Sequence, residues 1–189
     1  PFVGESGKMM WRTFRQHGIL RPQIYVTNVA KRHAPSSQYT KKPMSKDEQD
    51  KWQSLLLWEL KHLPNLTHIL CLGEDALTTL LPECQSGITK HRGSVYEWEG
   101  VPVLPTFNPA YCLREPKTEI IYQMDMMRFT NVLSGTFKQH TVEALINPSF
   151  NESMDFIDQL IRSGRPISWD IETTNNQTAC HGLSNDPHK

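Results

Sequence analysis

Two stretches of the chain show the same pattern: Tyr25-Val26-Thr27-Asn28-Val29 and Thr106-Phe107-Asn108-Pro109-Ala110-Tyr111. In each, an apolar, strand-like run meets a loop, and an asparagine stands at the change. In an open α/β sheet, ligands bind in the crevice beyond the carboxyl ends of the strands. We therefore expect the amides of Asn28 and Asn108 to converge on one small ligand and to read its hydrogen-bonding edge.

The elements expected around these stretches alternate between strands and helices. Helical patterns cover residues 5–17, 45–63, 76–81 and 117–133, and strand patterns cover residues 24–29, 68–72, 94–98 and 101–106. Such alternation favours a parallel sheet with helices on both faces. The sequence therefore predicts a three-layer αβα domain with a central, mainly parallel four-stranded sheet.

A second region begins after Leu133. Residues 134–140 include Ser134-Gly135-Thr136 and predict a linker. A strand at 142–146, a helix at 151–161 and a strand at 167–171 are expected to follow. We divide the chain into residues 1–133, cut short at the N-terminus, and residues 141–189, cut short at the C-terminus.

Charge and composition limit the function classes. Residues 1–46 carry nine lysines and arginines but one acid, although the whole chain has zero net charge. A basic end suits nucleic acid, but it also fits a solvated surface that is balanced by acids elsewhere. Four scattered cysteines without a C-x-x-C pair favour reduced thiols in the cytoplasm. No apolar run approaches the ~20 residues that cross a bilayer, so no membrane partner is expected.

Asparagine and aromatic side chains suggest how a base could be read. An amide offers one acceptor and two donors, which match the O4 and N3–H edge of uracil or thymine. Asn28 could equally be a turn residue bonded to its own backbone. Phe2, ahead of the first helix, could stack on a base for about 1–3 kcal/mol, or it could serve as a hydrophobic staple.

Acidic residues near the end point to a metal. Asp170 and Glu172 alternate with Ile171 on an expected strand, so both carboxylates point the same way. Two carboxylates on one face can hold a divalent metal that assists phosphoryl displacement. An exposed strand face gives the same pattern.

Taken together, several motifs resemble the uracil-DNA glycosylase superfamily, and within it the iron–sulfur branch called family 4. They occur in the family's order over about residues 1–130: Pro1-Phe2-Val3-Gly4-Glu5-Ser6-Gly7, Tyr25-Val26-Thr27-Asn28-Val29-Ala30-Lys31, Leu72-Gly73-Glu74-Asp75-Ala76, Arg92-Gly93 and Asn108-Pro109-Ala110-Tyr111-Cys112-Leu113-Arg114-Glu115-Pro116. The resemblance implies a uracil-DNA glycosylase-like fold that acts on DNA.

This resemblance implies roles for individual residues. Phe2 matches the aromatic that stacks on flipped uracil, and Asn28 matches the amide that reads its edge. Asn108 stands where the family usually has a histidine that stabilises the leaving uracil, which makes it the catalytic candidate. Leu113 and Arg114 fall in a loop that probes the DNA groove and fills the gap left by the flipped base.

The basic residues would hold the DNA backbone in this reading. Lys31, Arg32 and Arg114 are expected to contact phosphates, and such contacts weaken with salt. Arg92, in the run Lys90-His91-Arg92-Gly93, either touches the backbone as well or belongs to a solvated turn.

Three departures from the family pattern affect the expected chemistry. The family's water-positioning loop would precede Pro1. Asn108 can donate a hydrogen bond but cannot carry a positive charge, and losing one such donor typically costs about 3–4 kcal/mol in the barrier. Arg32 or His33, together with Trp52, stand near two positions of the cluster's cysteines. Because an iron–sulfur cluster needs thiolates, we expect none.

The second region resembles the start of the 3′–5′ exonuclease domain of DNA polymerases, an RNase H-like fold. Ser168-Trp169-Asp170-Ile171-Glu172-Thr173 matches its first motif, which implies a divalent metal such as Mg²⁺ at Asp170 and Glu172 once the domain is complete. We expect a monomeric segment of a phage-type polymerase that acts on uracil-containing, single-stranded template DNA in the host cytoplasm. Two functions stay open: a glycosylase that excises uracil, and a non-catalytic module that binds DNA or template uracil.

Overall fold

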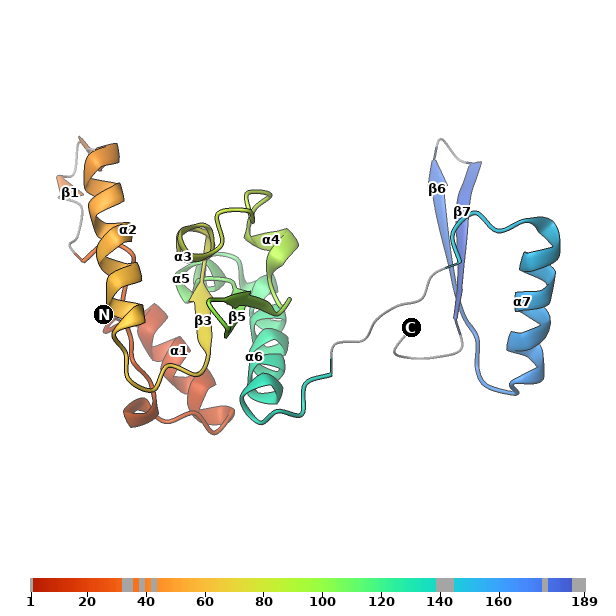
Figure 1. Ribbon diagram of the computed structural model, residues 1–189, viewed down its shortest axis with the longest axis horizontal. Coiled ribbons are helices and arrows are strands. Elements are labelled where there is room, and N and C mark those ends of the chain that lie inside the picture. Colours follow the sequence, from red (N-terminus) through yellow and green to blue (C-terminus); the bar gives the residue numbers. More distant parts are fainter. Residues whose placement is uncertain are drawn as a thin grey trace. The chain divides into compact units, whose positions relative to one another are not determined.

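The structure is a computed structural model that describes residues 2–31, 36–37, 40–41, 44–138, 145–174 and 177–184. The chain divides into two compact units, Pro1–Phe137 and Lys138–Lys189, called the first and second unit below (Figure 1). Among the described residues, no helix is both long enough and apolar enough to span a membrane.

The first unit combines helices with a small sheet (Figure 1). Its α-helices are α1 (Glu5–Gln16), α2 (Lys46–Lys61), α3 (Glu74–Leu80), α4 (Ile88–His91), α5 (Pro109–Arg114) and α6 (Glu119–Leu133). Two 3₁₀ turns, η1 (Arg21–Gln23) and η2 (Pro116–Thr118), lie beside them, and the short strands β1 (Ser36–Ser37) and β2 (Thr40–Lys41) pair with each other.

The sheet of the first unit contains β3 (Ile69–Leu72), β5 (Val101–Thr106) and β4 (Tyr96–Trp98), in that order. Strands β3 and β5 are parallel, with Ile69 opposite Val103 and Leu72 opposite Thr106. Strand β4 runs antiparallel to β5, and the two correspond to the strands predicted at residues 94–98 and 101–106. The described sheet is therefore small and mixed, whereas four mainly parallel strands were predicted.

The prediction of a strand at residues 24–29 is wrong. Ile24 has extended backbone angles, but residues 24–29 pair with no strand in the part of the chain that the structure describes. Residues 24–30 and 66–72 both line a cavity of about 1270 Å³. Since sheet strands must lie about 4.8 Å from a neighbour to share hydrogen bonds, β-branched composition alone does not make this segment a strand.

Helices cover both faces of the sheet. Neighbouring residues of a strand point to opposite faces, and Val103 and Leu104 of β5 belong to different apolar clusters. Leu104 packs with α1, α5 and α6 through Met10, Phe14, Cys112, Tyr122 and Met126. Val103 packs with α2 and α3 through Leu56, Leu60 and Leu77. The predicted arrangement of helices on both faces is thus present around the smaller sheet.

The second unit contains α7 (Phe150–Arg162) and an antiparallel hairpin of β6 (Ser168–Thr174) and β7 (Gln177–Ser184). Ser149 and Glu152 form a reciprocal capping box at the start of α7. Residues 139–144 lie outside the described residues, so part of the expected linker and of the strand at 142–146 does too. Residues 145–146 are not in a strand. The RNase H-like fold of this unit stays a prediction.

Candidate functional site

The cavity of the first unit contains all of the residues predicted to touch a base. Phe2, Asn28 and Asn108 come from separate motifs. All three line this cavity, which has a volume of about 1270 Å³. His68, just before β3, and Leu72, at the end of β3, also line the cavity. The cavity therefore extends along this strand. Its volume exceeds the roughly 300–1,000 Å³ of ordinary ligand pockets.

Helix α1 fixes the position of Phe2. The half-buried Phe2 ring packs against the apolar cluster that includes Met10 and Phe14, and its backbone is left-handed with φ 58°. A Cβ atom at Gly7 would lie 1.9 Å from the Phe2 carbonyl oxygen. A glycine at position 7 is therefore what allows the backbone of Phe2 to lie against α1.

Asn28 is an exposed residue on the cavity wall. Its side chain makes no hydrogen bond to any residue within the described ranges. The acceptor and the donors of this amide are therefore unused among the described residues.

Asn108, in contrast, is already engaged. It is the N-cap of α5, and its Oδ1 accepts a hydrogen bond from the backbone N–H of Ala110 at 2.9 Å. Its Nδ2 donates to the carbonyl oxygen of Leu72 at 3.1 Å, which ties the end of β3 to the start of α5. Because an amide nitrogen carries two hydrogens, one donor of Asn108 stays available.

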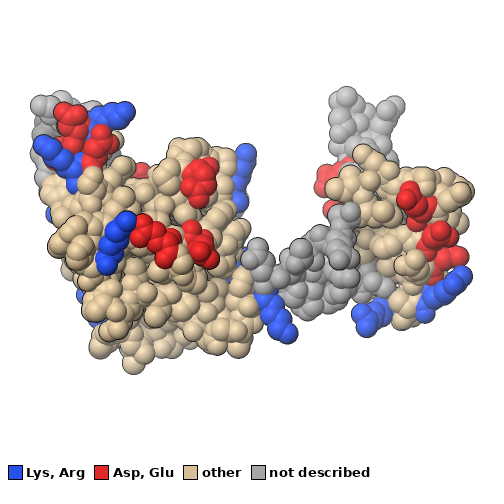
Figure 2. Space-filling view, viewed as in Figure 1, with Lys and Arg blue, Asp and Glu red and all other residues tan. Residues whose placement is uncertain are grey.

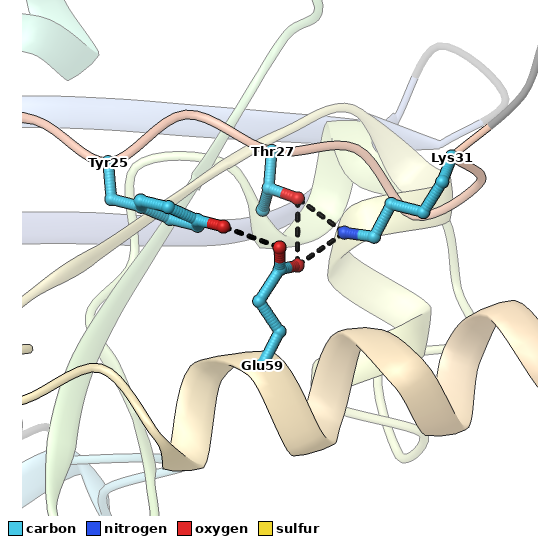
Figure 3. Close-up of polar contacts among 4 residues, drawn as sticks. All are labelled: Tyr25, Thr27, Lys31 and Glu59. Atoms are coloured by element: carbon cyan, nitrogen blue, oxygen red, sulfur yellow. Dashed lines mark hydrogen bonds and ion pairs between the residues drawn. The ribbon is translucent and has the colours of Figure 1, made fainter.

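The carboxylate of Glu59, on α2, binds the side chains of Tyr25, Thr27 and Lys31 (Figure 3). Tyr25 Oη donates to Glu59 Oε1 at 2.5 Å, and Thr27 Oγ1 donates to Glu59 Oε2 at 2.9 Å. Lys31 Nζ forms an ion pair with Glu59 and also donates to Thr27 Oγ1. Both Lys31 and Glu59 have side chains that are 22% exposed. The lysine predicted to grip phosphate is therefore paired within the protein.

These contacts shift two pKa values in opposite directions. Partial burial raises the pKa of Glu59, but hydrogen bonds from Lys31, Tyr25 and Thr27, with the charge of Lys31, outweigh it and lower the pKa overall. The hydrogen bond to Glu59, followed by burial and the carboxylate charge, raises the pKa of Tyr25. The cluster therefore favours an ionised Glu59 and a protonated Tyr25.

Arg92, another residue predicted to contact DNA, is paired with a buried acid. Its Nε donates to Asp125 Oδ2 at 2.8 Å, and its Nη2 forms an ion pair with Oδ1. Thr106 Oγ1 also donates to Asp125 Oδ2 at 2.7 Å, and Asp125 is 1% exposed. Arg92 thus links its turn to α6 and to the end of β5.

The other predicted DNA contacts lie on the surface or outside the described residues. Leu113, 47% exposed, and Arg114 end helix α5, where a loop was expected. Arg32 lies outside the described residues. On the face of the first unit seen in Figure 2, the described basic and acidic side chains are interspersed and form no continuous basic patch.

The residues at the predicted cofactor positions do not fit an iron–sulfur cluster. Trp52 lies on α2 with an indole N–H that is buried and has no partner among the described residues, and an indole cannot replace a thiolate. Position 33 is not described. The thiols of Cys71, Cys84 and Cys112 are buried, and burial above all raises the pKa of Cys71 to about 12.

The acids of the second unit lie on one strand. Asp170 and Glu172 occupy alternate positions of β6, both exposed, so they share a face. Asp170 Oδ1 accepts a hydrogen bond from the N–H of Ile171 at 3.0 Å. Within the described ranges, no group of three or more His, Cys, Asp or Glu side chains could hold a metal ion.

Sequence reasoning missed Glu59 and Asp125. Each is a single acid in an apolar part of a helix: Glu59 follows Leu55-Leu56-Leu57-Trp58, and Asp125 stands between Met124 and Met126. Acids are rarely buried unless they are paired, so an acid in such a run is a signal for a buried partner.

Known proteins share sequence with the first unit. The family model described as the uracil DNA glycosylase superfamily matches residues 1–133. The Type-4 uracil-DNA glycosylase of Thermotoga maritima is 35% identical over 121 residues, which are 64% of this chain and 60% of that protein. The corresponding protein of Archaeoglobus fulgidus is 29% identical over 136 residues, 68% of this chain and 65% of the relative.

A third relative has a different name. The DNA polymerase of Bacillus phage SP01 is 24% identical over 178 residues, which are 90% of this chain but 18% of the polymerase. The chain spans 60% and 65% of the lengths of the two glycosylases above. Because the family model covers residues 1–133, the chain belongs to the uracil-DNA glycosylase superfamily.

Proposed function

We propose that the first unit recognises uracil in DNA and that its cavity receives the flipped base. The observation that carries this proposal is the common cavity of Phe2, Asn28 and Asn108. Membership of the superfamily and the names of the Type-4 relatives support the choice of uracil.

Each residue would act by simple chemistry. A base must leave the stack before it can be read, and a single-stranded base leaves at the lowest cost. Phe2 would stack on the ring, and the unpartnered amide of Asn28 would meet the O4 and N3–H edge. Leu113 and Arg114, exposed at the end of α5, would contact the DNA next to the flipped nucleotide.

Excision needs more than recognition, and here Asn108 is the critical residue. Cleavage of the glycosidic bond places negative charge on the uracil, and donors aimed at this charge lower the barrier. The free hydrogen of Asn108 Nδ2 would be such a donor.

One observation favours a second function, a binding module without excision. Both polar atoms of the Asn108 amide already bond to Ala110 and Leu72, as a structural cap would. In that case the unit would hold template uracil without cutting it.

A single experiment separates the two functions. The purified protein is mixed with single-stranded oligonucleotides that differ only in one uracil or thymine, and both the dissociation constant and the formation of abasic sites are measured. Preference for uracil with abasic sites supports a glycosylase, and preference without them supports the binding module. Equal affinity for both oligonucleotides and no abasic sites would exclude both.

The second unit is proposed to begin a proofreading exonuclease within a phage-type DNA polymerase. The similarity to the phage polymerase over 90% of the chain supports this reading, because it extends beyond residues 1–133. Asp170 and Glu172 would then bind Mg²⁺ in the complete domain. In the full polymerase, Asp170→Asn should abolish 3′–5′ degradation of single-stranded DNA and leave uracil binding intact. Unchanged degradation would remove the metal assignment.

We also propose that the first unit works without an iron–sulfur cluster. The proposal rests on the chemistry of Trp52, whose indole side chain cannot ligate iron. Protein purified without oxygen should contain no stoichiometric iron and should lack the broad visible absorbance of a cluster. Iron at cluster stoichiometry would show that other thiols serve as ligands.

A further inference from the structure

We propose that Glu59 is a positioning residue for uracil recognition: it sets the conformation of the segment that carries Asn28. The proposal rests on the assignment of Asn28 as the reader of uracil. Nothing in the motifs assigns a role to Glu59, which lies on α2, 31 positions after Asn28 in the numbering.

The segment around Asn28 lacks the support of a sheet. Residues 24–28 are irregular and pair with no strand in the described part of the chain, and they line the same cavity as β3. Without backbone pairing, side-chain contacts must determine where this segment lies.

The polar side-chain contacts of this segment converge on one carboxylate, and the residues that make them lie on both sides of Asn28 in the chain, while Ile24 and Val29 pack against the apolar clusters. Tyr25 and Thr27 precede Asn28, Lys31 follows it, and all three side chains point toward Glu59 in Figure 3. Both carboxylate oxygens are used, Oε1 by Tyr25 and Oε2 by Thr27 and Lys31. Three donors on one acceptor fix the segment at three points.

Asn28 itself makes none of these contacts. It follows Thr27 directly in the chain, lines the cavity and has no hydrogen-bond partner among the described residues. Glu59 therefore acts on Asn28 through the backbone, by holding the residues on either side of it.

A second acid–lysine pair, between Lys61 of α2 and Glu99, provides a matched control. Lys61 Nζ and Glu99 Oε1 lie 2.6 Å apart, with side chains that are about half exposed. Glu59→Gln and Glu99→Gln therefore each remove one negative charge from an ion pair that joins α2 to another part of the first unit. The segment that carries Asn28 is connected only to the first of these pairs.

The experiment measures the ratio of dissociation constants for thymine- and uracil-containing single-stranded DNA. Loss of a charged hydrogen-bond acceptor should reduce this ratio about tenfold in Glu59→Gln. Tyr25→Phe, which removes one of the three donors, should reduce it by a smaller factor, and Glu99→Gln should leave it unchanged. Affinity for thymine DNA should stay the same in all three variants.

A double mutant tests whether Glu59 acts through Asn28. If it does, Glu59→Gln should cause no further loss of preference in an Asn28→Ala background, because coupled residues are not additive. Equal losses in both backgrounds, or a preference that survives Glu59→Gln and Tyr25→Phe, would overturn the positioning role while Asn28→Ala still identified the pocket. A wild-type protein without any preference would overturn both proposals, and Tyr25→Phe decides the question if Glu59→Gln does not fold.

Discussion

Gly7 decides, at the scale of single residues, where Phe2 can lie. We predict that Gly7→Ala weakens uracil binding several-fold, because the new methyl group would lie 1.9 Å from the Phe2 carbonyl oxygen and must displace it. Binding to uracil-containing single-stranded DNA is the measurement.

Gly4→Ala is the control for this substitution. Gly4 has φ −85°, and no atom lies within 4 Å of an added Cβ. The affinity of Gly4→Ala for uracil-containing single-stranded DNA should therefore equal that of wild type. If Gly7→Ala bound uracil as tightly as Gly4→Ala, the position of Phe2 would not matter for recognition.

The lowered pKa of Glu59 predicts a pH-dependent contribution to stability. A carboxyl group with a lowered folded pKa stabilises the protein fully above its unfolded pKa, about 4.3, and loses this effect as the pH falls through the folded value. The free energy of unfolding of wild type should therefore exceed that of Glu59→Gln at pH 7, and the gap should narrow below about pH 4.3. Urea unfolding at several pH values measures it, and a gap that stays constant would contradict the shift.

Phe2, Asn28 and Asn108 line one cavity, and their roles stay predictions; the hydrogen-bond and ion-pair partners of the site residues could not be predicted from the sequence. Asn108 bonds to a carbonyl 36 positions earlier, and the acids that hold Lys31 and Arg92 lie 28 and 33 positions away. A sequence shows the charge of such residues, but only the fold shows which opposite charge meets it. For this reason, DNA contacts predicted from charge alone are less secure than the cavity residues.

At the scale of elements, helix α6 is joined to the sheet by Asp125. We predict that Asp125→Ala lowers the free energy of unfolding by about 3–5 kcal/mol, because it leaves the charge of Arg92 without its buried partner. Thr106 loses its acceptor in the same variant. Chemical denaturation measures the change.

Glu119→Ala, on the same helix, is the control. Glu119 pairs with Arg12 at 3.0 Å on the surface, with side chains 43% and 61% exposed, so its loss should cost about 0–1 kcal/mol. Similar losses for the two variants would mean that burial does not strengthen the Asp125 pair.

Helices were easier to predict than strands in this chain. The helical spacing at 117–133 corresponds to α6, Glu119–Leu133, because its apolar residues repeat along a single element. The segment at 24–29 has strand composition but no neighbour to pair with, and pairing cannot be read from local sequence. Helix α5 was missed although Asn108-Pro109 is a good start signal, an N-cap followed by proline at the first helical position.

At the scale of the whole molecule, the charges that are free to meet DNA are fewer than the composition suggests. Among the described residues predicted to contact DNA, Lys31 and Arg92 are paired internally, whereas Arg114 is an exposed cation at the end of α5. We predict that Arg114→Gln reduces the slope of log affinity against log salt by about 0.7, the value for one phosphate contact on a single strand. Titrations at several salt concentrations measure this slope.

Arg12→Gln serves as the matched control, because Arg12 is an exposed arginine already paired with Glu119. It should leave the slope unchanged. A slope in Arg114→Gln equal to that of wild type would place the phosphate contacts elsewhere on the molecule.

The burial of three cysteines in the core of the first unit has a practical consequence. Cys71, Cys84 and Cys112 are buried, and the pKa of each thiol is raised, so the reactive thiolate is scarce in the folded state. Alkylating dyes would therefore label these positions only when the unit opens. These three cysteines are thus native probes for local opening of the first unit. The rate of opening can be followed by mass spectrometry without any engineered label.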